Sequence, residues 1–299
     1  ASVNIYDSGT ACQSGAFLSV TGGSTIQDLT FDGSCSSSNP SAGISVTAAG
    51  VTIEDVTVRD FANIGVSVSG SGGLTNDGVT YDSNGTGASV AGGTATFDND
   101  TFTDNTTGVA VSGGTATVTN SSFDGNTTGV NHTSGTANIG TTDGDGNTIA
   151  VPTGGTGISS AGGSIKDNTI AGGTYGIYLT AAGTNVYANT VSSAATEQIE
   201  CSGAFAGVGY NYVGGVIGLS TTCPDDSDQL GSPIAQWTDS NSLGTASAVA
   251  GPIFDLGNNA PFGYAPPLGR DSNYYATTSG AGTVTVTGGT TQFRMLMAG

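Results

Sequence analysis

A repeat of 21 residues dominates the first two thirds of the chain. Residues 84–104, 105–125 and 126–146 are three successive versions of nearly the same line. One apolar position recurs at this interval, with a single longer step, through Tyr81, Phe102, Phe123, Ile149, Ile170 and Val191. A unit this short cannot bury an apolar face alone, but stacked units can, because residue i then lies over residue i+21. The repeat therefore predicts a solenoid in which these six residues form one core ladder.

Each repeat contains three short segments in which apolar and polar residues alternate, separated by Gly, Asn or Asp. Alternation of this kind is typical of strands with one buried face. Helices are disfavoured because Gly and β-branched residues dominate the segments. Three strands per turn, stacked at roughly 4.8 Å, predict an all-β fold: a parallel β-helix with coils of about 21 residues.

Two further columns and two sets of turn residues accompany the core ladder. A second apolar column is expected through Ile26, Ile53, Leu74, Phe97, Val118, Ile139, Ile165 and Val186. A glycine that precedes an apolar residue recurs at Gly43, Gly65, Gly108, Gly129, Gly157 and Gly176. One turn is expected to hold asparagines whose side chains stack and whose backbone is left-handed: Asn63, Asn84, Asn105 and Asn126. A different turn is expected to hold Asn147, Asn168 and Asn189.

The charge of the chain restricts its partners. It has 4 Lys and Arg against 23 Asp and Glu, a net charge of −19. Binding to nucleic acid or to an anionic membrane surface needs clustered cations, so neither is expected as a partner. No apolar run approaches the length of a membrane span, so no membrane insertion is expected either. The start "ASVNIYDSG" has no Met and no signal peptide, which favours a processed, secreted protein.

The four cysteines support a secreted location. Cys12 and Cys35 are 23 residues apart, and Cys201 and Cys223 are 22 apart, which is about one coil in each case. Members of a pair should then lie on adjacent coils, at a distance that a disulfide can span. Two disulfides are therefore predicted, one near each end of the solenoid, in an oxidising compartment.

The Gly-Val/Ile steps, the Asn-x-Ile turns and the ladders resemble the right-handed parallel β-helix proteins of the pectate-lyase-like superfamily. The resemblance covers roughly residues 1–215 and implies the fold, while functions within that fold range from lyases and hydrolases to adhesins and structural proteins. Lyases of this fold use calcium-binding carboxylates with an Arg or Lys base, and its glycosidases carry Asn-Thr-Asp, paired Asp, Gly-His-Gly and Arg-Ile-Lys motifs. The coils carry none of these motifs, and the Asp225-Asp226 pair lies outside them. A protein without catalytic activity is therefore favoured, with a polysaccharide-cleaving enzyme kept as an alternative.

Individual residues that could carry chemistry have simpler interpretations. The acidic residues Asp98, Asp100, Asp104 and Asp124 are interpreted as turn residues rather than as a catalytic pair. His132 is interpreted as a surface or turn histidine, because no nucleophile or metal partner is in view. No cofactor is expected beyond a possible structural calcium ion, for which Asp143, Asp145 and Asn147 have the spacing of a calcium loop. That loop lacks its usual Gly and Glu, so a plain turn insertion is favoured.

Two kinds of surface feature remain. Sequons for N-glycosylation occur at Asn84, Asn99, Asn105, Asn120, Asn126 and Asn131, and glycans are a possible partner. Outward-facing threonines are expected at Thr94, Thr96, Thr115, Thr117 and Thr136, an arrangement that some ice-binding solenoids use, although threonine also suits exposed strands generally.

The chain is expected to divide into a solenoid, residues 1–215, and a C-terminal cap or docking region, residues 216–299. Six of the eight prolines lie between Pro224 and Pro267, and residues 283–297 are interpreted as a hairpin around Gly288-Gly289.

The first residues alternate like a strand instead of forming a capping helix, which would leave a strand edge for another molecule to cover. The leading hypothesis is therefore a structural, extracellular subunit that forms a surface filament, sheath or layer by head-to-tail self-association. The alternatives are a carbohydrate-binding or polysaccharide-cleaving β-helix and, third, an ice-binding protein.

Overall fold

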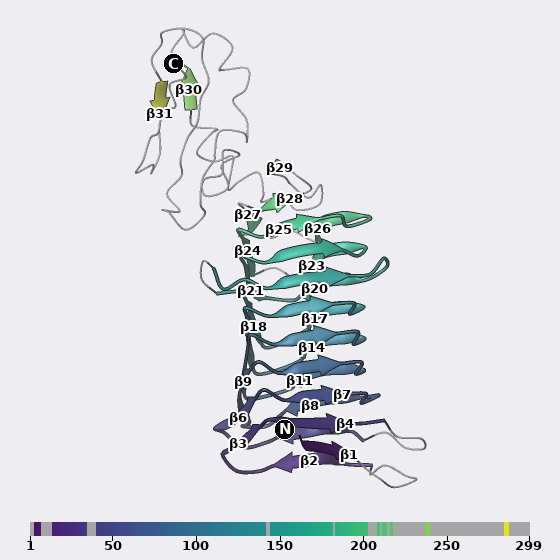
Figure 1. Ribbon diagram of the computed structural model, residues 1–299. Helices are drawn as coiled ribbons and strands as arrows, with labels where there is room; N and C mark the ends of the chain where they lie inside the picture. The colour runs from purple at the N-terminus through teal and green to yellow at the C-terminus, as the bar shows by residue number, and fades with distance from the viewer. Residues whose placement is uncertain are drawn as a thin grey trace.

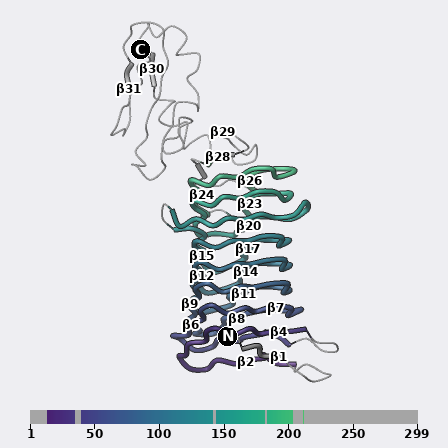
Figure 2. The backbone as a smooth tube through the Cα atoms, viewed as in Figure 1, coloured from purple at the N-terminus to yellow at the C-terminus, as the bar shows by residue number. Residues whose placement is uncertain are grey.

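The computed structural model describes residues 3–6, 14–34, 40–141, 144–181, 183–202, 208–209, 211–213, 216–217, 237–239 and 284–286. Within these residues the chain winds repeatedly through three sheets and forms a parallel β-helix (Figure 1, Figure 2). The expected fold class is confirmed: the sheets are parallel, and the coils are about 21 residues long.

Each coil contributes one strand to each sheet, and we name the sheets A, B and C. Sheet A contains β1 (Val3–Tyr6), β4 (Leu29–Asp32), β7 (Thr57–Arg59), β10 (Thr80–Asp82), β13 (Thr101–Thr103), β16 (Ser122–Asp124), β19 (Thr148–Val151), β22 (Thr169–Gly172), β25 (Thr190–Ser192), β28 (Tyr212–Val213) and the antiparallel β29 (Val216–Ile217). Sheet B contains β2 (Ala16–Val20), β5 (Ala42–Val46), β8 (Ile64–Val68), β11 (Thr86–Val90), β14 (Thr107–Val111), β17 (Thr128–His132), β20 (Thr156–Ser160), β23 (Tyr175–Leu179) and β26 (Glu197–Cys201). Sheet C contains β3 (Ser24–Gln27), β6 (Val51–Glu54), β9 (Gly73–Asp77), β12 (Thr94–Asp98), β15 (Thr115–Thr119), β18 (Thr136–Ile139), β21 (Gly163–Lys166), β24 (Thr184–Tyr187) and β27 (Val208–Gly209).

The core ladder runs along the inner face of sheet A. Register pairs join Tyr81 to Phe102, Phe102 to Phe123, Phe123 to Ile149, Ile149 to Ile170 and Ile170 to Val191. The three aromatic rings stack with centroids 4.6 Å apart at each step. All six side chains are at most 1% exposed, so like residues lie on like along this axis.

The second apolar column differs from expectation at one coil. Ile53 pairs with Asn76, and Asn76 pairs with Phe97, so Asn76 occupies the inward position that was expected for Leu74. Leu74 occupies the preceding inward position of β9, where it is in register with Val51 in β6 and Ala95 in β12. The coil from Ile53 to Asn76 is 23 residues long. The residue 21 positions after Ile53 is Leu74, which is apolar but is not in register with Ile53.

The recurrent glycine lines the inner side of sheet B. Its contacts explain why no larger residue is used there. A Cβ atom built on Gly108 would lie 2.6 Å from the carbonyl oxygen of Gly129 and 2.7 Å from the ring of Phe123. Glycine thus lets neighbouring coils approach closely beside the aromatic stack. In β2 the corresponding residue is Phe17, whose ring packs edge-on against Phe31 and Phe61 at the end of the core.

The first asparagine ladder lies at the turn between sheets A and B. It contains Asn84, Asn105 and Asn126, each at most 3% exposed, and each Oδ1 accepts the backbone N–H of the residue in the coil below. The expectation for Asn63 is wrong: its side chain is exposed, and Phe61 takes the ladder position beneath Asn84. The left-handed residues at this turn are also not the asparagines but the residues before them, Ser83 and Asp104 among others.

A second, separate ladder lies at the turn between sheets C and A, as the sequence predicted. Asn147, Asn168, Asn189 and Asn211 bond in series, with Oδ1 accepting a backbone N–H at 3.0 Å at each step between them. In earlier coils the same positions hold smaller or acidic residues. The N–H of Ser121 donates to Asn147 Oδ1, the N–H of Asp100 donates to the Ser121 hydroxyl, and the N–H of Val79 donates to Asp100 Oδ1.

Less of the C-terminal region is described. β31 (Val284–Val286) falls in the first half of the expected hairpin but pairs antiparallel with β30 (Trp237–Asp239), and residues 287–299 lie outside the described residues. The division at residue 215 therefore stays a prediction. Among the described residues there is no helix long and apolar enough to cross a membrane.

Candidate functional site

Three polar side chains meet inside the β-helix, and we call them the interior polar cluster: Asn76, Tyr81 and Asp100. Asn76 and Tyr81 are fully buried, and Asp100 is 1% exposed. The Asn76 amide donates a hydrogen bond to the Tyr81 hydroxyl. Asp100 Oδ1 accepts the Val79 N–H at 2.7 Å, while its Oδ2 and the Asn76 Oδ1 have no hydrogen-bond partner among the described residues. Asp100 thus lies at the turn between sheets C and A, as expected, but its side chain is buried in the core.

The environment of this cluster keeps its acidic groups protonated. Burial away from water raises the pKa of Asp100 from an ordinary 3.8 to about 8, and the carboxylates of Asp77 and Asp98 add to the effect. Burial, together with Asp100, also raises the pKa of Tyr81 well above its ordinary value. A neutral carboxyl group in the core can donate a hydrogen bond, but a group this deeply enclosed offers no access to a substrate. We therefore assign the cluster a structural role.

A buried histidine and serine form a second interior pair. His132 is 1% exposed, in contrast to the surface position that was expected, and lies in register with Val111 below and Ser160 above. Its Nδ1 is 3.0 Å from the Ser160 hydroxyl, which donates to the carbonyl oxygen of Gly162. The serine proton therefore points to a backbone oxygen, and neither side chain reaches solvent. This arrangement does not suit a serine nucleophile with a histidine base.

The possible calcium loop is not assembled by the described residues. Asn147 belongs to the second ladder, where its amide donates to Val118 O and to Asn168 Oδ1. Both oxygens of Asp145 accept hydrogen bonds from Thr141, which closes the turn. Asp143 lies outside the described residues. Among the described residues, no group of three or more acidic, His or Cys side chains could hold a metal ion.

The six sequons divide into two classes. Asn84, Asn105 and Asn126 are buried, and their amides donate within the ladder, so a sugar on any of them would displace these bonds and would have no space inside the closed coil. The prediction of glycosylation is therefore corrected for these three positions, which do not suit glycosylation of the folded chain. Asn99 and Asn120 are exposed turn residues, and Asn131 faces outward from β17 with a partly exposed side chain.

Of the four cysteines, the structure describes Cys201, which is 4% exposed in β26 and is not a free thiol. Cys12, Cys35 and Cys223 lie outside the described residues, so both disulfide pairings stay predictions.

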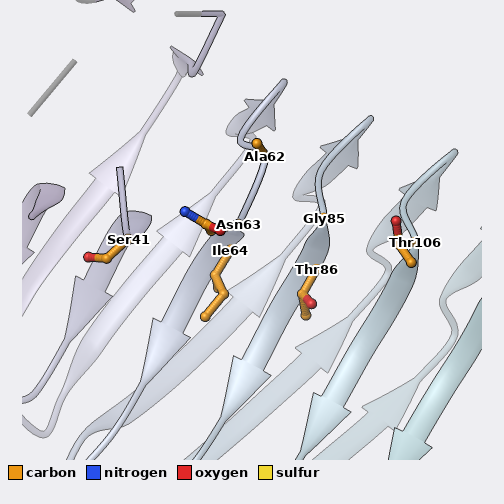
Figure 3. A pocket seen from close by; sticks show the side chains of 7 residues that line it. All are labelled: Ser41, Ala62, Asn63, Ile64, Gly85, Thr86 and Thr106. Atoms are coloured by element: carbon orange, nitrogen blue, oxygen red, sulfur yellow. The ribbon is translucent and has the colours of Figure 1, made fainter. Parts of the chain in front are cut away.

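A shallow hollow of about 590 Å³ lies on the surface beside the first asparagine ladder (Figure 3). Its walls come from consecutive turns and from the starts of sheet B strands, and it is lined by Ser41, Ala62, Asn63, Ile64, Gly85, Thr86 and Thr106. The lining carries no titratable side chain. The hollow therefore lacks the groups that acid–base chemistry would need.

Threonine columns on the outer surface are longer than the sequence indicated. On sheet C, Thr96 and Thr117 continue a column that begins with Thr25, Thr52 and Thr75. Beside it, Thr94, Thr115 and Thr136 form a second column. Two rows of threonine hydroxyl groups therefore run side by side along this face.

Comparison with known proteins supports the architecture. A family model described as "Right handed beta helix region" matches residues 2–149 and 42–209. No curated protein and no solved structure matches the chain. The matched residues include the first ladder, the interior polar cluster and the second ladder as far as Asn189.

Proposed function

We propose that this chain, which belongs to the right-handed β-helix family, is a structural protein that acts as a subunit of an extracellular filament, sheath or layer. The subunits would associate head to tail, with the open end of one solenoid against the opposite end of the next. The partner in this proposal is another copy of the same chain, and the location is outside the cell. An acidic composition and a cysteine that is not a free thiol support that location.

One observation carries the proposal: the apolar ladders reach an incompletely covered end at β2. Leu18 in β2 is half-buried, whereas Ile44 and Val66, which continue its column in β5 and β8, are fully buried. Phe17 and Leu29 at this end are also only partly buried. At the other end of sheet B, Ile199 is fully buried. An asymmetric rod with one partly open end is suited to a heterologous contact, which propagates when it does not close.

Replacing Leu18 by lysine is expected to abolish self-association while the subunit stays folded. A lysine at the open end can extend its ammonium group into water, but an abutting subunit would bury that charge. Light scattering of the full chain, followed by electron microscopy, measures the effect. Ser45→Lys, on the outer face of the neighbouring strand β5, is the matched control and should assemble as the natural chain does. A natural chain that stays monomeric at high concentration would rule out the proposal.

A second candidate function, ice binding, is favoured by the threonine columns on sheet C. If it is correct, the chain produces thermal hysteresis, and Thr96→Tyr abolishes it because the bulky ring interrupts both columns. Thr190→Tyr on sheet A is the control and should retain the full effect. Absence of hysteresis in the natural chain would exclude this function.

A further inference from the structure

The outer face of sheet B has a regular two-column pattern. In its typical strand the second, third and fifth residues are buried, so the first and fourth residues face outward. Through most coils these outward residues are small, for example Thr128 and Asn131 in β17 and Thr156 and Ser159 in β20. The face is visible as the stacked strands β11 to β26 in Figure 1. An aromatic residue at an outward position of this face is therefore an exception.

Strand β23 is that exception, because it places two tyrosine rings in contact on this face. Its outward residues are Tyr175 and Tyr178, whose rings stack with centroids 5.1 Å apart and planes at 26°. Both side chains are partly exposed. The two residues between them, Gly176 and Ile177, are buried, so both rings lie on the same side of the strand. We call Tyr175 and Tyr178 the tyrosine pair.

The backbone beneath the tyrosine pair is held in place from several directions. β23 pairs in parallel with β20 on one edge and with β26 on the other. A Cβ atom built on Gly176 would lie 2.2 Å from Cγ1 of Val191, so this part of the strand lies directly against the core. On the β20 edge the residues in register with the tyrosines, Thr156 and Ser159, are much smaller than the rings. The two phenol groups are thus kept in contact at a place that a solute can reach.

We propose that the tyrosine pair is a site of oxidative coupling, at which a one-electron oxidant that uses hydrogen peroxide joins the two rings into dityrosine. Two phenoxyl radicals combine readily when their rings meet, and the stack brings the rings together before any radical forms. Proximity of this kind converts a collision between molecules into a reaction within one molecule, which favours coupling inside the chain over coupling between chains. Tyr81 cannot serve in the same way, because it is fully buried and its ring stacks on Phe102.

The reaction balances as a two-electron oxidation. Each phenol loses one electron and its hydroxyl proton, and the two phenoxyl radicals then form one carbon–carbon bond between the ring positions next to oxygen. Each of these carbons afterwards gives up its proton while the neighbouring oxygen gains one, which restores both aromatic rings and both hydroxyl groups. Hydrogen peroxide accepts the two electrons and the two protons and becomes two molecules of water. The coupled chain therefore differs from the natural chain by the loss of two hydrogen atoms.

Coupling within the pair ends two radicals inside a single molecule. A radical on a tyrosine without such a neighbour would instead join two chains or pass to other side chains. The tyrosine pair thus acts as a sink for oxidising equivalents at the surface of the protein. It needs no contact between subunits, so the inference goes beyond self-association and stands or falls independently of it.

The test treats the full chain, at low concentration, with a haem peroxidase and hydrogen peroxide. Dityrosine fluorescence reports the new bond, and mass spectrometry after digestion should find a peptide that contains both tyrosines and has lost two hydrogen atoms. Tyr175→Phe and Tyr178→Phe each keep a ring in the stack but remove one phenol, so each should lower the yield by about tenfold or more. Tyr187→Phe, at a partly exposed position in β24 on sheet C, is the matched control and should change the yield less than about twofold.

Several results would overturn the proposal. An equal yield in the natural chain and in Tyr175→Phe/Tyr178→Phe would place the bond elsewhere. A yield that rises with protein concentration, together with linked chains on a denaturing gel, would show coupling between molecules. Absence of dityrosine under conditions that couple a free tyrosine derivative at the same concentration would show that the stacked rings do not react. A loss in Tyr187→Phe as large as the loss in either variant of the pair would show that radicals collect on tyrosines in general.

Discussion

Replacing Asn105 by alanine is expected to lower the free energy of unfolding by about 4 kcal/mol, because two buried backbone groups lose their partners. Asn105 Oδ1 accepts the N–H of Asn84 at 2.9 Å, and its amide donates to Tyr81 O at 3.0 Å. Alanine can replace neither bond, and the site is too deeply buried for bulk water to do so: Asn105 is 1% exposed. Each orphaned group costs about 1–3 kcal/mol.

Chemical denaturation followed by circular dichroism measures this effect. Asn131→Ala is the matched control, because Asn131 faces outward and the residue beneath it in register is already an alanine, Ala110. Its expected change is within about 0.5 kcal/mol. A third variant, Asn105→Asp, keeps the acceptor for the Asn84 N–H and loses the donor to Tyr81. A loss below about 1 kcal/mol in Asn105→Ala would contradict the structural role that we assign to the ladder.

The overall fold was predictable because the repeat length determines which residues lie next to each other. In a solenoid the residue one period away is the spatial neighbour, so Tyr81, Phe102 and Phe123 could be placed in one stack from their spacing alone. The separation of the two asparagine ladders was predictable for the same reason. The Asn63 error arose where the step differs from 21, since the ladder residue beneath Asn84 is Phe61, 23 residues earlier.

Polar residues inside the core were missed because hydrophobic patterning searches for apolar residues. His132 follows Val111 by one period, and that spacing alone would have placed it inward. Asp100 likewise follows the buried Val79 by 21 residues. The outward positions of the sheet B strands could not be anticipated by simple alternation, because two consecutive buried residues put them three apart. The end at β2 required coordinates, since partial burial of Leu18 depends on what covers it.

Replacing Asp100 by asparagine is expected to stabilise the chain by roughly 5 kcal/mol at pH 8 and to remove a pH dependence of the natural protein. The pKa of Asp100 is about 8 in the folded state against an ordinary 3.8. Below pH 3.8 both the folded and the unfolded state hold the proton. Between pH 3.8 and about 8 the unfolded state releases it while the folded state keeps it, so the free energy of unfolding falls by about 1.4 kcal/mol per pH unit. Above about pH 8 the loss is constant.

The ladder itself shows why asparagine suits this position. Asp100 occupies the place that Asn147, Asn168 and Asn189 occupy in later coils, and its Oδ1 accepts a backbone N–H as theirs do. Those asparagines also use their amides to donate to backbone oxygens, for example Asn147 to Val118 O at 2.9 Å. An amide at position 100 would add such a donor where the natural side chain has an oxygen without a partner among the described residues.

Denaturation of both chains from pH 4 to pH 9 measures the effect. The natural protein should lose stability steadily up to about pH 8, and Asp100→Asn should remain nearly constant over the range that Asp100 controls. Asp124→Asn, at an exposed position in β16, is the matched control and should follow the natural profile. If Asp100→Asn followed the natural profile too, Asp100 would have to be ionised in the folded state. The ladder would then tolerate a buried charge, because its backbone donors compensate for the lost hydration.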